Sequence, residues 1–244
     1  MGPAGSALSA QPRALQAAIE HVRSLGIQAV LFDMDGVIVD SIEPHLRAWN
    51  QILAEDGLPP LGVKTYLQVV GTTNRGILFR QLEKLGLELT ADQKRRLIDR
   101  KEERLRTIMR AEARPTPGVV TWLEYLRRKG IRCAVASSGE MANIVTILES
   151  LRLAKYFMAL VSAADLPASK PDPQIFLLAA AAVGVPPEHC LAVEDAPSGV
   201  KAAKAAGMAA CALSITVPAS ELREADLLLE NLAALQPESL FGVG

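Results

Sequence analysis

Short apolar runs of strand length alternate with segments of helical apolar spacing along most of the chain after residue 27. The runs are nearly continuous rather than alternating, which is typical of parallel strands buried on both faces. We therefore expect an α/β fold with a doubly wound, Rossmann-like parallel sheet. The predicted strands are 27–32, 131–136, 158–162, 190–193 and 209–213, and the helices that follow the insertion described next are 118–129, 140–150, 174–183 and 198–206.

Two segments depart from this alternation. Residues 11–25 have helical apolar spacing and end at Gly26, a common residue after a helix, so 1–26 is predicted to be an N-terminal helical extension. Residues 43–113 consist of charged, leucine-spaced segments with no β-branched run. This texture predicts an inserted helical domain, which leaves 27–42 and 114–244 to form the α/β core.

Composition narrows the class of protein further. The chain has 244 residues, of which 50% are hydrophobic, and 26 Lys and Arg against 27 Asp and Glu give a net charge of −1. That balance provides no field to attract nucleic acid or an anionic membrane, and no apolar run approaches the ~18 residues of a membrane span. Three cysteines without framework spacing favour a reducing cytoplasm over a secreted scaffold. Oligomeric state is not readable from the sequence.

Polar side chains follow each of the first four predicted strands. Because ligands bind outside the carboxyl ends of parallel strands, we expect these side chains to converge at one edge of the sheet. They are Asp33 and Asp35 after the first strand, Ser137 and Ser138 after the second, Lys170 beyond the third, and Glu194 and Asp195 after the fourth.

This set of residues has the chemistry of a phosphoryl-transfer site. Four carboxylates at one point would repel one another unless a cation lay among them, and an all-oxygen set suits Mg²⁺ better than zinc. A lysine, hydroxyl groups and a helix N-terminus after Ser138 suit a phosphate dianion. Of two aspartates at i and i+2, one can attack phosphorus while the other transfers a proton. Taken one at a time, these residues also have ordinary structural interpretations. The aspartates could be turn residues and the serines could be helix caps. The lysine could be a solvated loop residue, and the later acids could be a surface pair.

At these residues the sequence resembles the haloacid dehalogenase superfamily, in its phosphatase and phosphomutase branch. The motifs that carry the resemblance are Asp33-Met34-Asp35-Gly36-Val37, Ser137, Lys170 within 169–173, and Glu194-Asp195. The resemblance implies that Asp33 is the nucleophile, that Asp35 is the general acid/base, and that Ser137 and Lys170 bind the transferred phosphate. It also implies Mg²⁺ held by Asp33, the carbonyl of Asp35, and Asp195, with Glu194 bound directly or through water. Dehalogenating members are less similar because their first motif lacks the second aspartate.

The helical insertion resembles the small cap domain of this family, which closes over the site and determines specificity. Residues 43–49 are similar to a β-phosphoglucomutase segment that contributes a cap histidine, and His45 is the matching position. Lys101 lies about where that enzyme has a sugar-contacting lysine, although it also fits a solvent-exposed helix with interleaved charges. Residues 71–75 resemble a turn that carries a distal phosphate-binding arginine, but Arg75 comes one position late.

Three functions are compatible with these residues. The leading hypothesis is a Mg²⁺-dependent phosphatase acting on a small phosphorylated metabolite, most plausibly a sugar phosphate, through an aspartyl-phosphate at Asp33. The second is a β-phosphoglucomutase-like isomerase, which needs a cationic cap group to hold a bisphosphate. The third is a catalytically silent binding protein on the same fold. The presence of both Asp33 and Asp35 argues against the third hypothesis, and the sequence does not identify the substrate.

Overall fold

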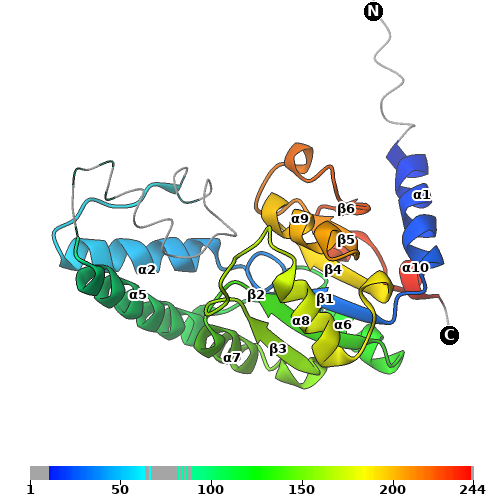
Figure 1. Cartoon of the computed structure of the whole chain (residues 1–244), viewed down its shortest axis with the longest axis horizontal. Coiled ribbons are helices and arrows are strands. Elements are labelled where there is room, and N and C mark those ends of the chain that lie inside the picture. The colour runs from blue at the N-terminus through cyan, green and yellow to red at the C-terminus, as the bar shows by residue number, and fades with distance from the viewer. Residues whose placement is uncertain are drawn as a thin grey trace, which may run out of the picture.

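The centre of the protein is a six-stranded, all-parallel sheet (Figure 1). The computed structural model describes residues 11–63, 66, 82, 84, 86 and 89–242. The strand order is β3-β2-β1-β4-β5-β6. Strands β2 and β3 therefore lie on one side of β1, and β4, β5 and β6 lie on its other side. This confirms the predicted parallel α/β fold and places the switch point between β1 and β4. The strands are β1 Ala29–Phe32, β2 Arg132–Ser137, β3 Ala159–Ser162, β4 Cys190–Glu194, β5 Ala209–Leu213 and β6 Leu227–Leu229.

Helices cover both faces of the sheet because successive strand residues point to opposite sides. On one face, side chains such as Val30 and Phe32 pack with α1 (Gln11–Ser24), α6 (Val119–Arg128), α7 (Met141–Ser150) and α10 (Glu238–Phe241). On the other face, Ala29, Leu31 and further alanines pack against α8 (Gln174–Val183) and α9 (Pro197–Ala205). Short 3-10 helices lie at Ala154–Tyr156, Pro187–His189, Ala219–Glu221 and Leu232–Ala234.

Two helices of the predicted insertion extend away from the sheet side by side (Figure 1): α2 (Ile42–Glu55) and α5 (Ala91–Glu112). They share a small apolar cluster that includes Trp49, Ile52 and Leu97. The later half of α5 leaves this cluster, since Leu105 and Met109 are buried in the main core. One helix therefore belongs to two apolar clusters, and the division of the chain at residues 43 and 113 stays a prediction.

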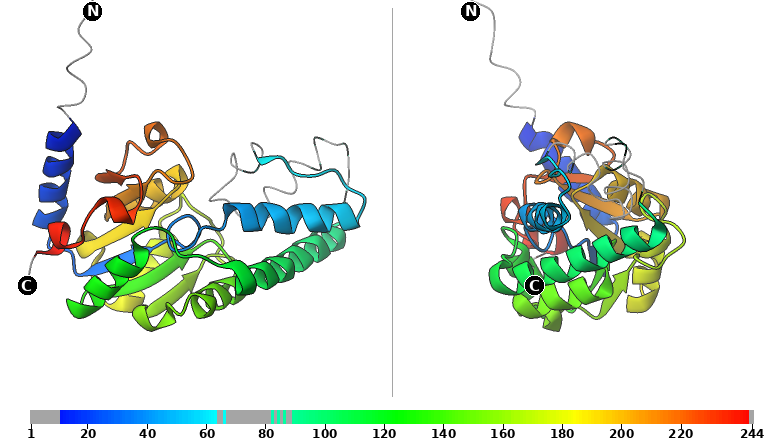
Figure 2. Two further views of the ribbon diagram at one scale, coloured as in Figure 1. Left: turned by 180° about the vertical axis from the view of Figure 1, so that it is seen from behind. Right: turned by 90° about the vertical axis from the view of Figure 1, so that its left-hand side faces the viewer.

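The N-terminal helix packs on the core at the end of the molecule opposite α2 and α5 (Figure 2). Ile19 and Val22 are buried, and the Nε of Arg23 donates to the carbonyl of Ser239 at 3.0 Å, which links α1 to α10. Neither β6 nor α10 was predicted, because elements of three and four residues are too short to show a period in the sequence. Among the described residues, no helix is both long and apolar enough to cross a membrane.

Candidate active site

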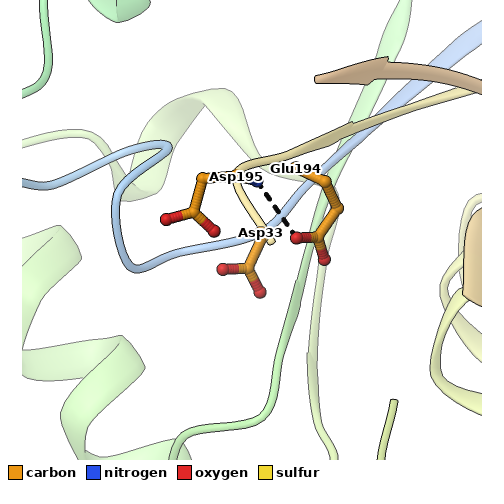
Figure 3. A group of neighbouring side chains, drawn as sticks. All are labelled: Asp33, Glu194 and Asp195. Carbon is orange, nitrogen blue, oxygen red and sulfur yellow. Dashed lines mark hydrogen bonds between the residues drawn. The ribbon is translucent and has the colours of Figure 1, made fainter. Parts of the chain in front are cut away.

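Three buried carboxylates gather where β1 and β4 end. The register pairs Phe32 with Val193, and the backbone N–H of Asp33 donates to the carbonyl of Val193 at 2.9 Å. Asp33 therefore leaves the sheet beside Glu194 and Asp195, the residues that follow Val193. Figure 3 shows the three side chains together, and one oxygen from each lies within 4.8 Å of the others.

Lys170 provides the positive charge nearest to this cluster. Its Nζ donates to Asp33 Oδ1 at 2.6 Å, to Glu194 Oε1 at 2.5 Å and to the carbonyl of Ala136 at 3.1 Å. Although burial acts to lower it, the charges of Asp33 and Glu194 raise the pKa of Lys170. The lysine is therefore an ammonium ion, and its single charge balances only one of the three carboxylates.

The negative charge that Lys170 does not balance raises the pKa of the neighbouring acids. Burial, with the charges of Glu194 and Asp35, raises the pKa of Asp33 to about 7 against the opposing charge of Lys170. Burial and the charges of Asp33 and Glu194 also raise the pKa of Asp195 well above its usual range. A divalent cation would remove this repulsion, and a donor set made only of carboxylate oxygens suits Mg²⁺.

Two glycines leave space for these carboxylates. A Cβ at Gly36 would lie 2.0 Å from Asp195 Oδ2, and a Cβ at Gly199 would lie 1.9 Å from the carboxyl carbon of Glu194. Any larger residue would displace the acid that it meets. The backbone is thus shaped around the carboxylate cluster, which fits a site that holds a cation.

The two predicted serines lie at the end of β2, just before α7. The Oγ of Ser137 accepts a hydrogen bond from the N–H of Gly139 at 3.1 Å. The Oγ of Ser138 is buried and has no hydrogen-bond partner within the described parts of the chain. The N-cap of α7 is Glu140, so neither serine is the N-cap residue. An unpartnered buried hydroxyl beside a helix N-terminus suits an anion, although the phosphate-binding role stays a prediction.

The Asp35 carboxylate lies beside Ser41 and His45, at the start of α2, rather than in the carboxylate cluster. Ser41 Oγ donates to its Oδ1 at 2.5 Å, and His45 Nε2 lies 3.3 Å from the same oxygen. Burial acts to raise the pKa of Asp35, but the pairing with His45 and the hydrogen bond from Ser41 lower it to about 2. His45 Nδ1 in turn lies 2.9 Å from Lys101 Nζ. Of the three cap candidates, His45 therefore contacts Asp35 and Lys101 contacts His45, while Arg75 lies outside the described residues.

Two hydroxyl groups at the site were not predicted. Thr216 Oγ1 donates to Asp195 Oδ2, and Ser41 donates to Asp35. Thr216 follows β5, so the same search beyond the carboxyl ends of strands would have found it one strand further along. Ser41 is the N-cap residue of α2, a position that a capping pattern can suggest.

The fold and the site together define an α/β enzyme whose acidic and cationic groups gather at the carboxyl edge of a parallel sheet. The family model of haloacid dehalogenase-like hydrolases matches residues 27–207. The chain belongs to this family, which confirms the resemblance carried by its motifs.

Named relatives include phosphatases and a phosphomutase. The chain is 31% identical over 224 residues to phosphoglycolate phosphatase 1 of Pseudomonas aeruginosa, covering 85% of this chain and 78% of that protein. It is 33% identical over 219 residues to β-phosphoglucomutase of Bacillus subtilis, covering 88% and 94%. Its structure is similar to that of a variant of CbbY from Rhodobacter sphaeroides in complex with xylulose-(1,5)bisphosphate, with a TM-score of 0.80, 26% identity and coverage of 88% and 99%. The protein is thus an enzyme of the phosphatase type, with phosphomutase as the alternative.

Proposed function

We propose that the protein is a Mg²⁺-dependent phosphatase that hydrolyses a small phosphorylated metabolite, of the sugar phosphate class, through an aspartyl-phosphate on Asp33. The observation that carries the proposal is the position of Asp33, 2.6 Å from Lys170 and within the Glu194 and Asp195 cluster. Asp35, two residues later, supplies a second carboxylate for proton transfer. The relatives that act on phosphorylated carbohydrates and phosphoglycolate support the substrate class.

The reaction proceeds in two displacements at phosphorus. An oxygen of Asp33 attacks the phosphorus, the bond from phosphorus to the substrate oxygen breaks, and the leaving oxygen takes a proton from Asp35. A water oxygen then attacks the phosphorus, its proton passes to the Asp35 carboxylate, and the bond to Asp33 breaks to release inorganic phosphate. The ionised form of Asp35, which its low pKa favours, is the form that accepts the proton from water.

The other polar groups hold the phosphoryl group in place. Lys170 balances the charge on its oxygens, and Ser137 and Ser138 supply hydroxyl groups beside the start of α7. Asp33, the carbonyl of Asp35, Asp195 and Glu194 would hold Mg²⁺, which neutralises charge on the phosphoryl oxygens when it is bound.

The test is a panel of phosphorylated metabolites with Mg²⁺, monitored for released phosphate. Asp33→Asn keeps the side-chain volume but removes the nucleophile, so turnover and phosphoenzyme formation should fall at least ~10³-fold. Asp40→Asn is the matched control, because Asp40 is an exposed aspartate on the same segment. Turnover by Asp33→Asn at the rate of the Asp40 variant would rule out the mechanism.

The second candidate function is a β-phosphoglucomutase-like isomerase. It is favoured by the relative of that name and by the meeting of His45 and Lys101 beside Asp35. With β-glucose 1-phosphate and a bisphosphate primer, a mutase would form glucose 6-phosphate, whereas the phosphatase would release inorganic phosphate. A contribution of Arg75 to a second phosphate site stays a prediction.

A cytoplasmic location of the protein also stays a prediction. It is supported by the free, buried cysteines Cys133, Cys190 and Cys211.

A further inference from the structure

A continuous chain of polar groups runs from the buried Asn143 on α7, through the buried Glu102 and Lys101, to the partly exposed His45 and Asp35. Asn143 Nδ2 on α7 donates to Glu102 Oε2 on α5 at 2.7 Å, and Lys101 Nζ donates to Glu102 Oε1 at 3.0 Å. The same Nζ lies 2.9 Å from His45 Nδ1 on α2, and His45 Nε2 lies 3.3 Å from Asp35 Oδ1. Side chains from three helices that are distant in sequence are thus linked in one chain, which ends at the Asp35 carboxylate.

The ion pair in the middle of this chain is completely buried. Lys101 and Glu102 are each 0% exposed, which is rare for charged residues and carries a large desolvation penalty. Burial lowers the pKa of Lys101, and the charge of Glu102 opposes that shift. Stability alone is a weak reason for such a pair, since a well-packed apolar pair is often as stable.

The arrangement has a direct consequence for His45. A lysine ammonium has three donors and no acceptor, so the Nδ1 atom that faces it must accept. In a neutral imidazole the proton then resides on Nε2, the atom that faces Asp35. Lys101 therefore selects the tautomer in which His45 is a donor toward the Asp35 carboxylate.

We propose that Glu102 is a positioning residue, which fixes Lys101 against His45 so that His45 presents an Nε2–H to Asp35. The hydrogen bonds of Glu102 described above join it to Lys101 and Asn143, and of these two residues Lys101 is the one that faces His45, so the effect of Glu102 on His45 passes through Lys101. The arrangement of His45 follows from the structure alone. Its consequence for turnover rests on the proposed phosphatase function.

A simpler role for Glu102 would be to join α5 to α7. The structure offers a second bridge between these helices, in which Arg106 donates to Asn143 Oδ1 at 3.0 Å and lies 3.5 Å from Glu140 Oε2. Both of these partners of Arg106 lie at α7, away from His45 on α2. Arg106→Gln therefore perturbs the contact between α5 and α7 but leaves the selection of the His45 tautomer by Lys101 in place. It serves as the control for a purely structural effect.

Glu102→Gln is the sharpest test variant. Glutamine fits the same space but has an NH₂ group in place of one carboxylate oxygen, so a donor rather than an acceptor would face either Lys101 or Asn143. Asn143 cannot turn its amide over to compensate without losing the bond from Arg106 to its Oδ1. The substitution also removes the negative charge that pairs with Lys101.

The primary measurement is the ¹⁵N NMR spectrum of histidine-labelled protein without Mg²⁺ or substrate. The chain has three histidines, and His45→Gln identifies the His45 signals. We expect an unprotonated Nδ1 and a protonated Nε2 in the unaltered protein, and a shift toward the opposite tautomer in Glu102→Gln. Arg106→Gln and Glu103→Gln, an exposed neighbour, should leave the signals unchanged. Unaltered His45 signals in folded Glu102→Gln would overturn the proposal.

Two further measurements keep the test decisive. If Glu102→Gln does not fold, the double variant Lys101→Met with Glu102→Gln removes both buried charges, and it should lose the same tautomer preference; retention would overturn the proposal. With p-nitrophenyl phosphate and Mg²⁺, Glu102→Gln should lower kcat about tenfold and leave KM unchanged. The loss is smaller than the whole contribution of proton transfer to the rate, because Asp35 itself is still present. An unaltered protein without phosphatase activity would refute the proposed function, while the NMR result would still decide the role of Glu102.

Discussion

At the scale of single residues, the direction of the Asp195 carboxylate depends on two neighbours. Gly36 leaves the space that its Oδ2 occupies, and Thr216 donates a hydrogen bond to the same oxygen. A carboxylate that is anchored at one oxygen keeps its other oxygen in a fixed direction. Groups of this kind outside the ligand set commonly change metal affinity by 10–100-fold when they are removed.

Thr216→Val should therefore weaken Mg²⁺ binding about tenfold, because valine keeps the shape of threonine but cannot donate to Asp195. Calorimetric titration of the substrate-free protein with Mg²⁺ measures this directly. Thr216→Ser restores the hydroxyl group and should restore most of the affinity. Equal Mg²⁺ affinity in the valine variant and the unaltered protein would show that Thr216 does not orient Asp195.

The residues at this edge of the sheet differ in how far the sequence could predict them. Asp33, Glu194 and Asp195 directly follow apolar runs, so the geometry of a parallel sheet brings them together without further information. Lys101 and His45 are 56 positions apart on different helices, and their contact depends on how α2 and α5 pack. Periodicity along a chain carries no information about such packing, which is why only the family resemblance suggested this pair.

At the scale of elements, the start of α6 shows how closely the connections are fitted. Gly118 has a φ of +86°, and a Cβ there would lie 2.2 Å from the backbone nitrogen of Ala233. One turn later, Trp122 Nε1 donates to the carbonyls of Leu232 and Leu235 at 3.0 and 2.9 Å. The helix is thus fixed at its first turns against the segment at 232–235, which follows the short strand β6.

Gly118→Ala should destabilise the protein by about 2 kcal/mol or more, because it combines backbone strain with a clash against backbone. Gly130→Ala is the matched control, since Gly130 has a φ of +68° but nothing within 4 Å of its added Cβ. The control should cost about 1 kcal/mol from strain alone. Urea unfolding measures both free energies, and equal losses would mean that the contact with Ala233 has no energetic weight.

The same region marks the limit of prediction for whole elements. Strands β1, β2, β4 and β5 are short apolar runs, and the structure places them within two residues of the predicted positions. Strand β6 has three residues between Asp226 and Glu230, and it forms because β5 offers a free edge with Cys211 facing Leu227. A strand that is specified by a neighbour's edge leaves little pattern of its own in the sequence.

At the scale of the whole molecule, α5 connects the insertion to the core. Its first half contributes Leu97 to the cluster shared with α2, and its second half contributes Leu105 to the main core cluster, which includes Val30 and Phe32 of β1. Glu102 and Lys101 lie between these two leucines, so the charged pair occupies the border between the clusters. If 43–113 is a separate domain, this border is where cooperativity between the two parts should weaken.

Leu97→Ala and Leu105→Ala test this division with the same substitution on one helix. Both leucines are buried, at 4% and 0% exposure, so each loss should cost about 2–5 kcal/mol in the unit to which the leucine belongs. Leu105→Ala should lower the protection of β1 and β4 against hydrogen exchange, because it weakens the main core. Leu97→Ala should speed exchange in α2 and the first half of α5 and leave β1 and β4 protected, since local opening there needs no opening of the sheet. Equal loss of protection in the sheet from both variants would instead make the protein one cooperative unit, and movement of the insertion relative to the core would then require partial unfolding of both.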